Sequence, residues 1–198
     1  GFSTDKKIDH FTVGNDRELD LFLAKYDVIA SKAHAKMLGK IGLLTLKETD
    51  SLVTELDKIA KTIEDGTFTI EDSFEDMHSK IEFLLTLRLG DAGKKIHTAR
   101  SRNDQVLVAM HLYLKNELTE IKDQTKDLFH LLLNLADKHK KVMLPGYTHL
   151  QIAMPSSFGL WFSAYAESLV DDLYFVAVSY THLRAHETSL HLVCRLLL

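Results

Sequence analysis

Residues 97–105, HTARSRNDQ, form a dense polar segment at the start of a long run that contains neither Gly nor Pro. If that run is a helix, its first turn exposes backbone N–H groups and a partial positive charge, which together favour an anion. Arg102 adds a planar guanidinium that suits a carboxylate, and Asn103 adds an amide donor. A simpler interpretation makes Ser101 the N-cap of the helix, with solvated charges around it. The pattern alone leaves both interpretations open.

Residues 145–151, PGYTHLQ, bring a hydroxyl, an imidazole and an amide close together in a short turn. These groups belong to Thr148, His149 and Gln151. Histidine is the side chain most easily tuned for proton transfer near neutral pH, so the turn is a candidate for acid–base chemistry. The simpler interpretation is an interhelical loop with a hydrogen-bonded histidine, and the pattern by itself favours that interpretation.

His78 is a third candidate, because it lies in an acidic segment, EDMH at residues 75–78, early in a predicted helix. Carboxylates at such a position often only complement the helix dipole, and a lone histidine there is more often structural than functional. His182, His186 and Glu187 occur in the order HxxxHE, which lacks the HExxH spacing of zinc proteases. The sequence therefore predicts no metal site, and it contains no nucleotide-binding glycine pattern or hydrolase nucleophile elbow.

The elements that must position these residues are predicted to be helices, because strong helix formers are abundant and turn clusters are few. Apolar residues at three-to-four spacing predict helices over about 16–38, after Thr45, and over about 71–89. Thr45 and Glu48 predict a capping box at the start of the second of these helices. Residues 1–100 are therefore expected to form an N-terminal helical domain.

A second domain, part of a long-helix central bundle, is predicted over residues 101–177. Residues 101 to about 141 predict one helix roughly 60 Å long with an apolar stripe at heptad spacing. A helix of that length cannot hide its stripe inside a small monomer, so we expect a bundle shared between subunits. Pro155 is expected to start another helix that runs to about Val178 and suits burial in a bundle core. The predicted fold class is all-α.

Composition narrows the choice of partners and compartment. The net charge of −4 is mixed along the 198 residues, which argues against a nucleic-acid or anionic-membrane partner. The sequence contains no run of about 18 apolar residues, so no membrane span is predicted. Residues 1–7 lack a signal-peptide pattern. The single Cys194 excludes an internal disulfide and fits a reducing compartment, so a cytoplasmic location is expected.

Two segments in combination carry a family resemblance. KIHTARSRNDQV at residues 95–106, followed about forty residues later by PGYTHLQ, closely resembles the argininosuccinate lyase family. EDMH resembles that family's acidic-His helix start, and FTVGNDR at residues 11–17 resembles its N-terminal substrate-contacting loop. The similarity runs from about residue 11 to 176. The string SRNDQ favours this branch of the fumarase and aspartase superfamily over adenylosuccinate lyase or fumarase.

The resemblance implies an all-helical homotetramer that eliminates fumarate from argininosuccinate to give arginine, with neither cofactor nor metal. The family abstracts a proton next to a succinyl carboxylate and stabilises a dianionic aci-carboxylate, so cationic and hydrogen-bonding groups should dominate catalysis. By resemblance, His149 and Thr148 are the catalytic residues. The implied substrate-binding residues are Thr12, His78, Ser101, Arg102, Asn103 and Gln151.

The sequence departs from the family at several places. Ala99 replaces a usual Gly, and Thr12 stands where relatives carry Ser. Residues 178–198 match nothing expected of the family and resemble translated adapter or vector sequence, so we predict an artefactual tail. The loop that carries the family's catalytic Ser is absent, so this N-terminal fragment is expected to be inactive and to aggregate alone. A non-enzymatic, crystallin-like helical scaffold and another lyase of the superfamily are the alternatives.

Overall fold

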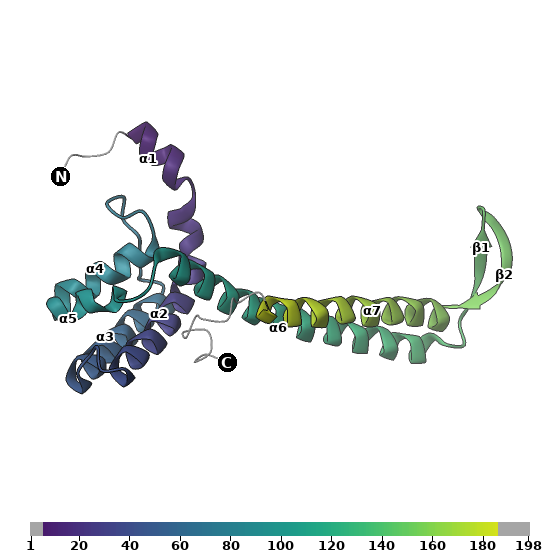
Figure 1. Ribbon diagram of the computed structural model, residues 1–198. Helices are drawn as coiled ribbons and strands as arrows, with labels where there is room; N and C mark the ends of the chain where they lie inside the picture. The colour runs from purple at the N-terminus through teal and green to yellow at the C-terminus, as the bar shows by residue number, and fades with distance from the viewer. Residues whose placement is uncertain (1–5, 186–198) are drawn as a thin grey trace. The chain divides into compact units, whose positions relative to one another are not determined.

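The computed structural model describes residues 6–185, which form helices joined by short links and one two-stranded hairpin (Figure 1). The predicted tail therefore lies largely outside the described residues. The described residues form two compact units, divided between residues 113 and 114, inside one long helix, α6. The expected division of the sequence at residues 100 and 177 stays a prediction.

The first unit is helical throughout, with α2 packed against α3 and α4. Its elements are α1 (Lys6–Val13), α2 (Asp16–Lys40), α3 (Leu46–Glu64), α4 (Met77–Leu89), α5 (Asp91–Lys94), a 3₁₀ turn η1 (Lys95–His97) and the start of α6 (Arg102–His139). Apolar side chains of α2, α3 and α4 are fully buried between these helices and form the core of the unit. The predicted helix over 16–38 is confirmed by α2.

A capping box starts α3, as the sequence predicts. The backbone N–H of Glu48 donates to Oγ1 of Thr45 at 3.2 Å, and the Thr45 N–H donates to Oε2 of Glu48 at 2.9 Å. The hydrogen bond from Lys95, 2.5 Å long, and those from Thr45 lower the pKa of Glu48 to about 2. Because Lys95 lies in η1, this carboxylate also ties the start of α3 to the segment before α6.

The third predicted helix begins later than expected, and the prediction of its start at residue 71 is wrong. Residues 65–76 form a link instead, and Asp76 caps α4 by accepting the Ser79 N–H at 2.7 Å. Arg17 of α2 holds this link, because its Nε donates to the carbonyl oxygen of Phe74 at 2.8 Å. The carbonyl oxygens of Asp72 and Phe74 accept hydrogen bonds from Arg17 rather than from a following turn of helix. The helix starts after Asp76, because that side chain caps the first turn of α4.

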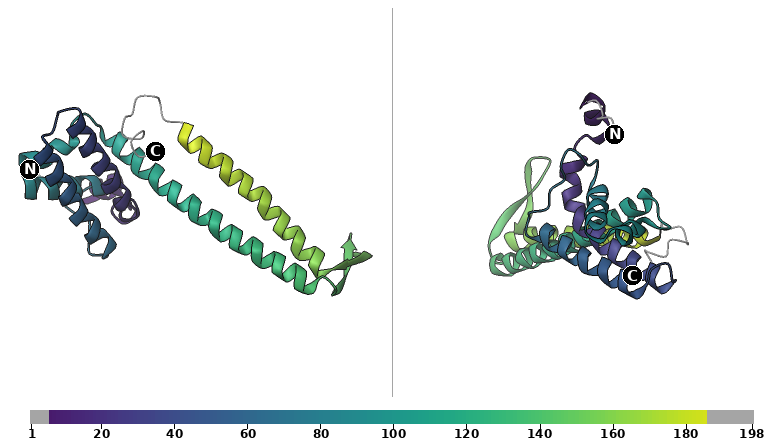
Figure 2. Two further views of the ribbon diagram at one scale, coloured as in Figure 1. Left: turned by 90° about the horizontal axis from the view of Figure 1, so that it is seen from below. Right: turned by 90° about the vertical axis from the view of Figure 1, so that its left-hand side faces the viewer.

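The second unit contains the remainder of α6, a β-hairpin and α7. Its further elements are β1 (Met143–Thr148), β2 (Gln151–Ser157) and α7 (Phe158–Ala185). The 38 residues of α6 confirm the prediction of one helix of about forty residues. α7 runs back alongside the second half of α6 (Figures 1 and 2). Gly159 permits this packing, since a Cβ there would lie 2.6 Å from Cα of Lys140.

The hairpin corrects the expectation that Pro155 starts a helix, whereas the predicted all-α class is confirmed, because the described chain is mostly helical. Pro155 lies in β2, where its partner in β1 is Pro145. Proline has no N–H to donate, but both strands of a two-stranded sheet are edges, so such a pair is tolerated there. α7 begins only at Phe158, where Oγ of Ser157 accepts the Leu160 N–H at 3.1 Å, and it extends past Val178. The fold class stands as mostly helical.

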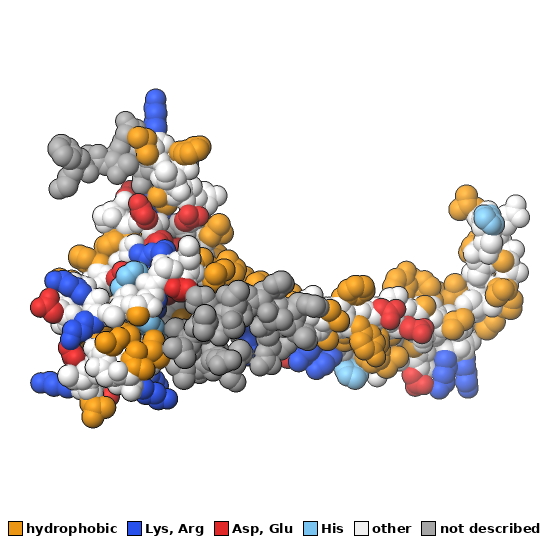
Figure 3. Space-filling view, viewed as in Figure 1, with side chains coloured by type: hydrophobic (Ala, Val, Ile, Leu, Met, Phe, Trp, Pro, Cys, Tyr) orange, Lys and Arg blue, Asp and Glu red, His pale blue; other side chains and the backbone are white. Residues whose placement is uncertain are grey.

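α7 carries a large exposed apolar surface (Figure 3), and its burial in a bundle shared between subunits stays a prediction. Trp161 is 47 % exposed and Phe175 is 76 % exposed, whereas Ala166 is buried. The physical reason is that α6 is the other helix of the second unit, so only one side of α7 is covered by a helix of that unit. Among the described residues, no helix is both long and apolar enough to cross a membrane.

Candidate functional site

Ser101 caps α6 through a reciprocal pair of hydrogen bonds with Asp104. The Asp104 N–H donates to Oγ of Ser101 at 3.3 Å, and the Ser101 N–H donates to Oδ2 of Asp104 at 2.7 Å. The capped-helix interpretation is therefore confirmed. The cap uses the N–H groups of residues 101 and 104, which leaves those of Arg102 and Asn103 in the first turn without an intrahelical acceptor. The anion-site interpretation rests on these two residues and stays a prediction.

Arg102 joins the first turns of α4 and α6. Its Nη2 donates to Oγ of Ser79 at 3.3 Å, and its Nη1 donates to Oε1 of Gln105 at 3.0 Å. Two carboxylates of the α4 region, Asp76 and Glu82, each lie 3.5 Å from the guanidinium. The side chain is 36 % exposed, so it holds the two helix starts together and still meets solvent. A negatively charged ligand would have to compete with these two carboxylates.

His78 is buried in the first turn of α4, and its partner is a carboxylate that the sequence did not identify. Its Nδ1 lies 2.9 Å from Oδ1 of Asp27, and the two side chains are 1 % and 0 % exposed. Asp20, also on α2, accepts the Met77 N–H at 3.0 Å, and burial raises the pKa of Asp20. Asp20 and Asp27 are two helical turns apart, so one face of α2 presents both carboxylates to the start of α4. A signal for them existed in that seven-residue spacing of acids along one helix.

A second buried polar group lies just before α6. Nη2 of Arg100 donates to Oγ of Ser31 at 3.2 Å. Burial lowers the pKa of Arg100, and the negative charge of Asp27 partly offsets this. Nε2 of His34 lies 2.9 Å from the carbonyl oxygen of Thr98, to which it must donate, and burial lowers the pKa of His34 to about 4. These side chains fix the segment that leads into the Ser101 cap, and sequence reasoning missed them.

The turn that contains His149 lies in the second unit. Thr148 ends β1 and Gln151 begins β2, so His149 and Leu150 form a two-residue turn. Both have positive φ, +51° for His149 and +63° for Leu150, which is the geometry of a type I′ turn. Such turns favour Asn-Gly, and a non-glycine residue there is strained, so the tip of the hairpin stores conformational energy. All four side chains are exposed.

The two predicted groups of site residues are thus each assembled within one unit. The first unit brings His78, Ser101, Arg102 and Asn103 to the starts of α4 and α6, and the second brings Thr148, His149 and Gln151 to one hairpin tip. Among the described residues, no group of three or more His, Cys, Asp or Glu is arranged to hold a metal ion.

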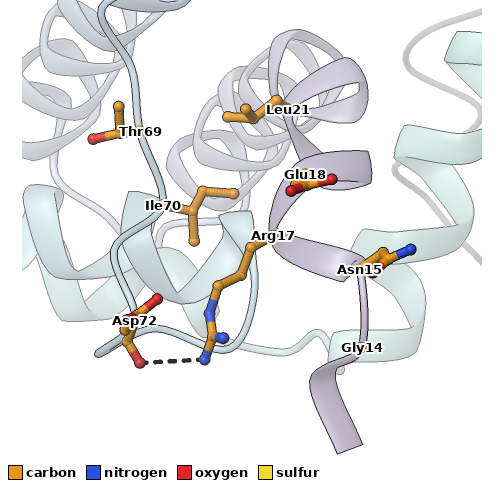
Figure 4. Close-up of a pocket in the computed structure, with 8 residues that line it drawn as sticks. All are labelled: Gly14, Asn15, Arg17, Glu18, Leu21, Thr69, Ile70 and Asp72. Carbon is orange, nitrogen blue, oxygen red and sulfur yellow. Dashed lines mark hydrogen bonds between the residues drawn. The ribbon is translucent and has the colours of Figure 1, made fainter. Parts of the chain in front are cut away.

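Thr12 lies apart from both groups, in α1, where its Oγ1 donates to the carbonyl oxygen of Ile8 at 2.9 Å. The second half of the predicted substrate-contacting loop instead borders an open cavity of about 420 Å³ (Figure 4). The cavity is lined by Gly14, Asn15, Arg17, Glu18, Leu21, Thr69, Ile70 and Asp72. Arg17 spans one side of it and donates to the carbonyl oxygen of Asp72 at 3.2 Å.

Known proteins match both the sequence and the fold. An argininosuccinate lyase from Phocaeicola vulgatus is 57 % identical over 175 residues, which cover 88 % of this chain and 39 % of that enzyme. An argininosuccinate lyase from Xylella fastidiosa is 45 % identical over 172 residues, covering 87 % of this chain and 39 % of the enzyme. The chain therefore spans about two fifths of the length of these relatives.

Two solved structures share the fold. An EDDS lyase variant with bound fumarate gives a TM-score of 0.72 at 22 % identity, covering 93 % of this chain and 36 % of that one. A fumarate lyase:delta crystallin from Brucella melitensis gives 0.71 at 20 % identity, covering 84 % and 41 %. The resemblance drawn from the sequence segments is confirmed. The family model described as lyase matches residues 2–188, and the chain belongs to this lyase family.

Proposed function

We propose that the complete protein represented by this chain is an argininosuccinate lyase, which eliminates fumarate from argininosuccinate and leaves arginine. The observation that carries the proposal is the 57 % identity over 175 residues to an enzyme of that name. Any stretch of 175 residues in a chain of 198 includes both candidate segments. The similarity therefore extends to the residues that would do the chemistry as well as to the helical scaffold.

The reaction transfers no group to the protein. A base removes a proton from the carbon next to one succinyl carboxylate, and the electron pair of that C–H bond first delocalises into the carboxylate. The pair then forms the C=C bond of fumarate while the C–N bond breaks and the guanidinium nitrogen leaves with its electrons. The charge that develops on the carboxylate oxygens has to be stabilised by fixed donors.

The start of α6 supports this role for Arg102 and Asn103. Their first-turn N–H groups are not used by the Ser101 cap, and a helix N-terminus favours negative charge. The partly exposed guanidinium of Arg102 adds a planar donor to the same helix start. Ser101 then organises the site through its cap, because its hydroxyl is already committed to Asp104.

His149 and Thr148 are proposed as the catalytic pair, with Gln151 as a neighbouring substrate contact. The positive φ of His149 supports this, because strained backbone is retained where a side chain must be aimed at a particular place. His78 and Thr12 complete the proposed substrate-binding set.

We further propose that the complete protein is a homotetramer that works in the cytoplasm. The exposed apolar side chains of α6 and α7 support association, since they are too extensive for the surface of an ordinary monomer. The 177 residues before the predicted tail contain no cysteine, which supports a compartment in which disulfides do not form.

The test starts from the gene. Its codons for residues 176–198 are resequenced, and the complete protein that it encodes is assayed for fumarate release from argininosuccinate by ultraviolet absorbance. We expect turnover in the wild type and a loss of about 10²–10⁴-fold in His149→Asn. His130→Asn changes an exposed histidine on α6 in the same way and should leave the rate within a few-fold of wild type.

The alternatives predict different results in the same assay. A non-enzymatic scaffold of the crystallin kind would bind no substrate and release no fumarate. Another lyase of the superfamily would turn over adenylosuccinate, aspartate or malate and leave argininosuccinate unchanged. Either result from a folded, complete protein would contradict the proposal.

A further inference from the structure

We propose that Asp27 is a positioning residue for His78, which fixes the Nδ1–H tautomer of the imidazole and leaves Nε2 as the ring nitrogen that can accept a hydrogen bond. The effect of Asp27 on catalysis rests on the proposed function. The tautomer itself is a property of the chain.

The contact that carries the inference is the 2.9 Å between Oδ1 of Asp27 and Nδ1 of His78. Both side chains are almost completely removed from solvent, at 0 % and 1 % exposure. The contact is not aligned as a hydrogen bond in this structure, and neither Nδ1 of His78 nor either carboxylate oxygen of Asp27 has another hydrogen-bond partner. A carboxylate oxygen accepts hydrogen bonds, so a proton on Nδ1 is the arrangement that pairs these buried atoms with each other. In a neutral imidazole, the proton on Nδ1 makes Nε2, on the far side of the ring, an acceptor.

The backbone around the pair holds the ring in place from two directions. The N–H of Met77, the residue before His78, donates to Oδ2 of Asp20 at 3.0 Å. Ser79, the residue after it, donates its N–H to Oδ1 of Asp76 at 2.7 Å and accepts from Arg102 through Oγ at 3.3 Å. Main-chain anchors therefore fix the Cα of His78, and Asp27 is left to fix the rotation and tautomer of its ring.

A contribution to stability is a weaker explanation for the Asp27–His78 pair than orientation of the ring. A buried ion pair contributes little net stability, because removing two charges from water costs about as much as their attraction returns. The negative charge of Asp27 also raises the pKa of Arg100 against the effect of burial, so Arg100 is a further cation near this carboxylate. Orientation of a ring whose neighbour in the chain, Ser79, accepts a hydrogen bond from Arg102 gives the pair a function that stability alone does not.

The first experiment reads the tautomer in the complete protein that the resequenced gene encodes. The chain is labelled with ¹⁵N at its histidine rings, and the His78 signals are assigned with His78→Gln. We expect Nδ1 to be the protonated nitrogen of His78 in the wild type. In Asp27→Asn, whose amide can also donate, the Nδ1–H signal should be lost or mixed. An Nε2–H tautomer in the wild type overturns the proposal even if Asp27→Asn does not fold.

Asp20→Asn is the matched control, because it makes the same change two turns earlier on α2, at a carboxylate that binds the backbone rather than the ring. The His78 signals should keep the Nδ1–H tautomer in this variant. If Asp20→Asn alters the tautomer as much as Asp27→Asn does, the specific role of Asp27 is contradicted.

The second experiment measures kcat and KM for fumarate release in the complete protein. Asp27→Asn should lose about 10²-fold in kcat/KM while its thermal midpoint stays close to that of Asp20→Asn. A loss of activity that follows stability equally in both variants overturns the positioning role. If the wild type releases no fumarate, the proposed function fails, and the tautomer experiment still decides the inference.

Discussion

Nη2 of Arg102, the first residue of α6, lies 3.3 Å from Oγ of Ser79 in the first turn of α4. This contact and the 3.5 Å approaches to Asp76 and Glu82 connect two helix starts that are separated by an intervening helix and a turn. Because the guanidinium is partly exposed, solvent screens much of the attraction. The connection is therefore expected to contribute modestly to stability.

Replacement of Arg102 by methionine, which keeps an apolar stem, should lower the free energy of unfolding by about 1 kcal/mol. Urea unfolding of the complete protein at one fixed concentration, followed by circular dichroism, measures the change. Lys94→Met removes an exposed cation from an ion pair within α5 and should change stability by less than about 0.5 kcal/mol. Equal losses in the two variants would show that Arg102 does not join the helices.

Leu150→Gly should stabilise the hairpin. Leu150 has a φ of +63° and is 97 % exposed, so glycine relieves backbone strain and removes no packing. The relief of about 1–2 kcal/mol exceeds the entropy that glycine adds to the unfolded chain, for a net gain of about 0.5–1 kcal/mol. Slower hydrogen exchange of the β1 and β2 amides reports this gain. Ile152→Gly, at an exposed strand position, should speed exchange, and a faster rate in Leu150→Gly would contradict the turn geometry.

Stability should fall as the pH drops from about 6.5 to 4, because of His34. Burial, with help from the charge of Arg100, lowers the folded-state pKa of His34 to about 4 from 6.5. The unfolded chain therefore binds a proton in this range that the folded chain does not, and stability decreases with falling pH. The full effect is on the order of 3 kcal/mol.

Denaturant unfolding at a series of pH values measures the His34 effect. In His34→Gln, whose amide can still donate to the Thr98 carbonyl, the slope of stability between pH 6.5 and 4 should become distinctly shallower. An unchanged slope would mean that His34 is not the group that binds the proton.

Ala99→Gly should also stabilise the chain, since Ala99 has a φ of +59° just before the α6 cap. The left-handed conformation costs an alanine about 1–2 kcal/mol, and after the entropy of glycine a net gain of about 0.5–1 kcal/mol remains. Thermal unfolding measures the gain. Ala164→Gly, in the interior of α7, should instead cost about 1 kcal/mol. Destabilisation by Ala99→Gly would show that residue 99 is not held at positive φ.

The chain by itself should associate through its exposed apolar side chains, among them Leu160 and Phe175 on α7. Sedimentation velocity over a range of concentrations measures the association. Phe175→Glu should reduce it, whereas Glu167→Asp, at an exposed acidic position on the same helix, should leave it unchanged. A monodisperse wild-type monomer with a sharp, cooperative thermal transition would contradict this expectation.

Local signals in the sequence predicted the elements that local physics controls. The Thr45 and Glu48 capping box, the Ser101 cap and the long α6 follow from side chains within a few residues of one another. The hairpin was missed because its turn residues, His149 and Leu150, are not those that a type I′ turn favours, and because Pro155 also suits the start of a helix.

Contacts between distant segments set the rest of the candidate site. The partner of His78 is Asp27, 51 positions earlier in the sequence, and nothing in either local pattern selects the other. The start of α4 was likewise placed too early, because the carbonyls of the preceding link are held by Arg17 of another helix. Sequence periodicity identifies which residues lie on a helix face, but it does not identify the helix that the face meets.

The central claim is that this chain represents an argininosuccinate lyase. The most direct test is fumarate release from argininosuccinate by the complete protein that the resequenced gene encodes, with His149→Asn and His130→Asn measured beside it. The account predicts turnover in the wild type and in His130→Asn, and a large loss in His149→Asn. A folded wild-type protein that releases no fumarate from argininosuccinate, or a His149→Asn variant that keeps full activity, would contradict it.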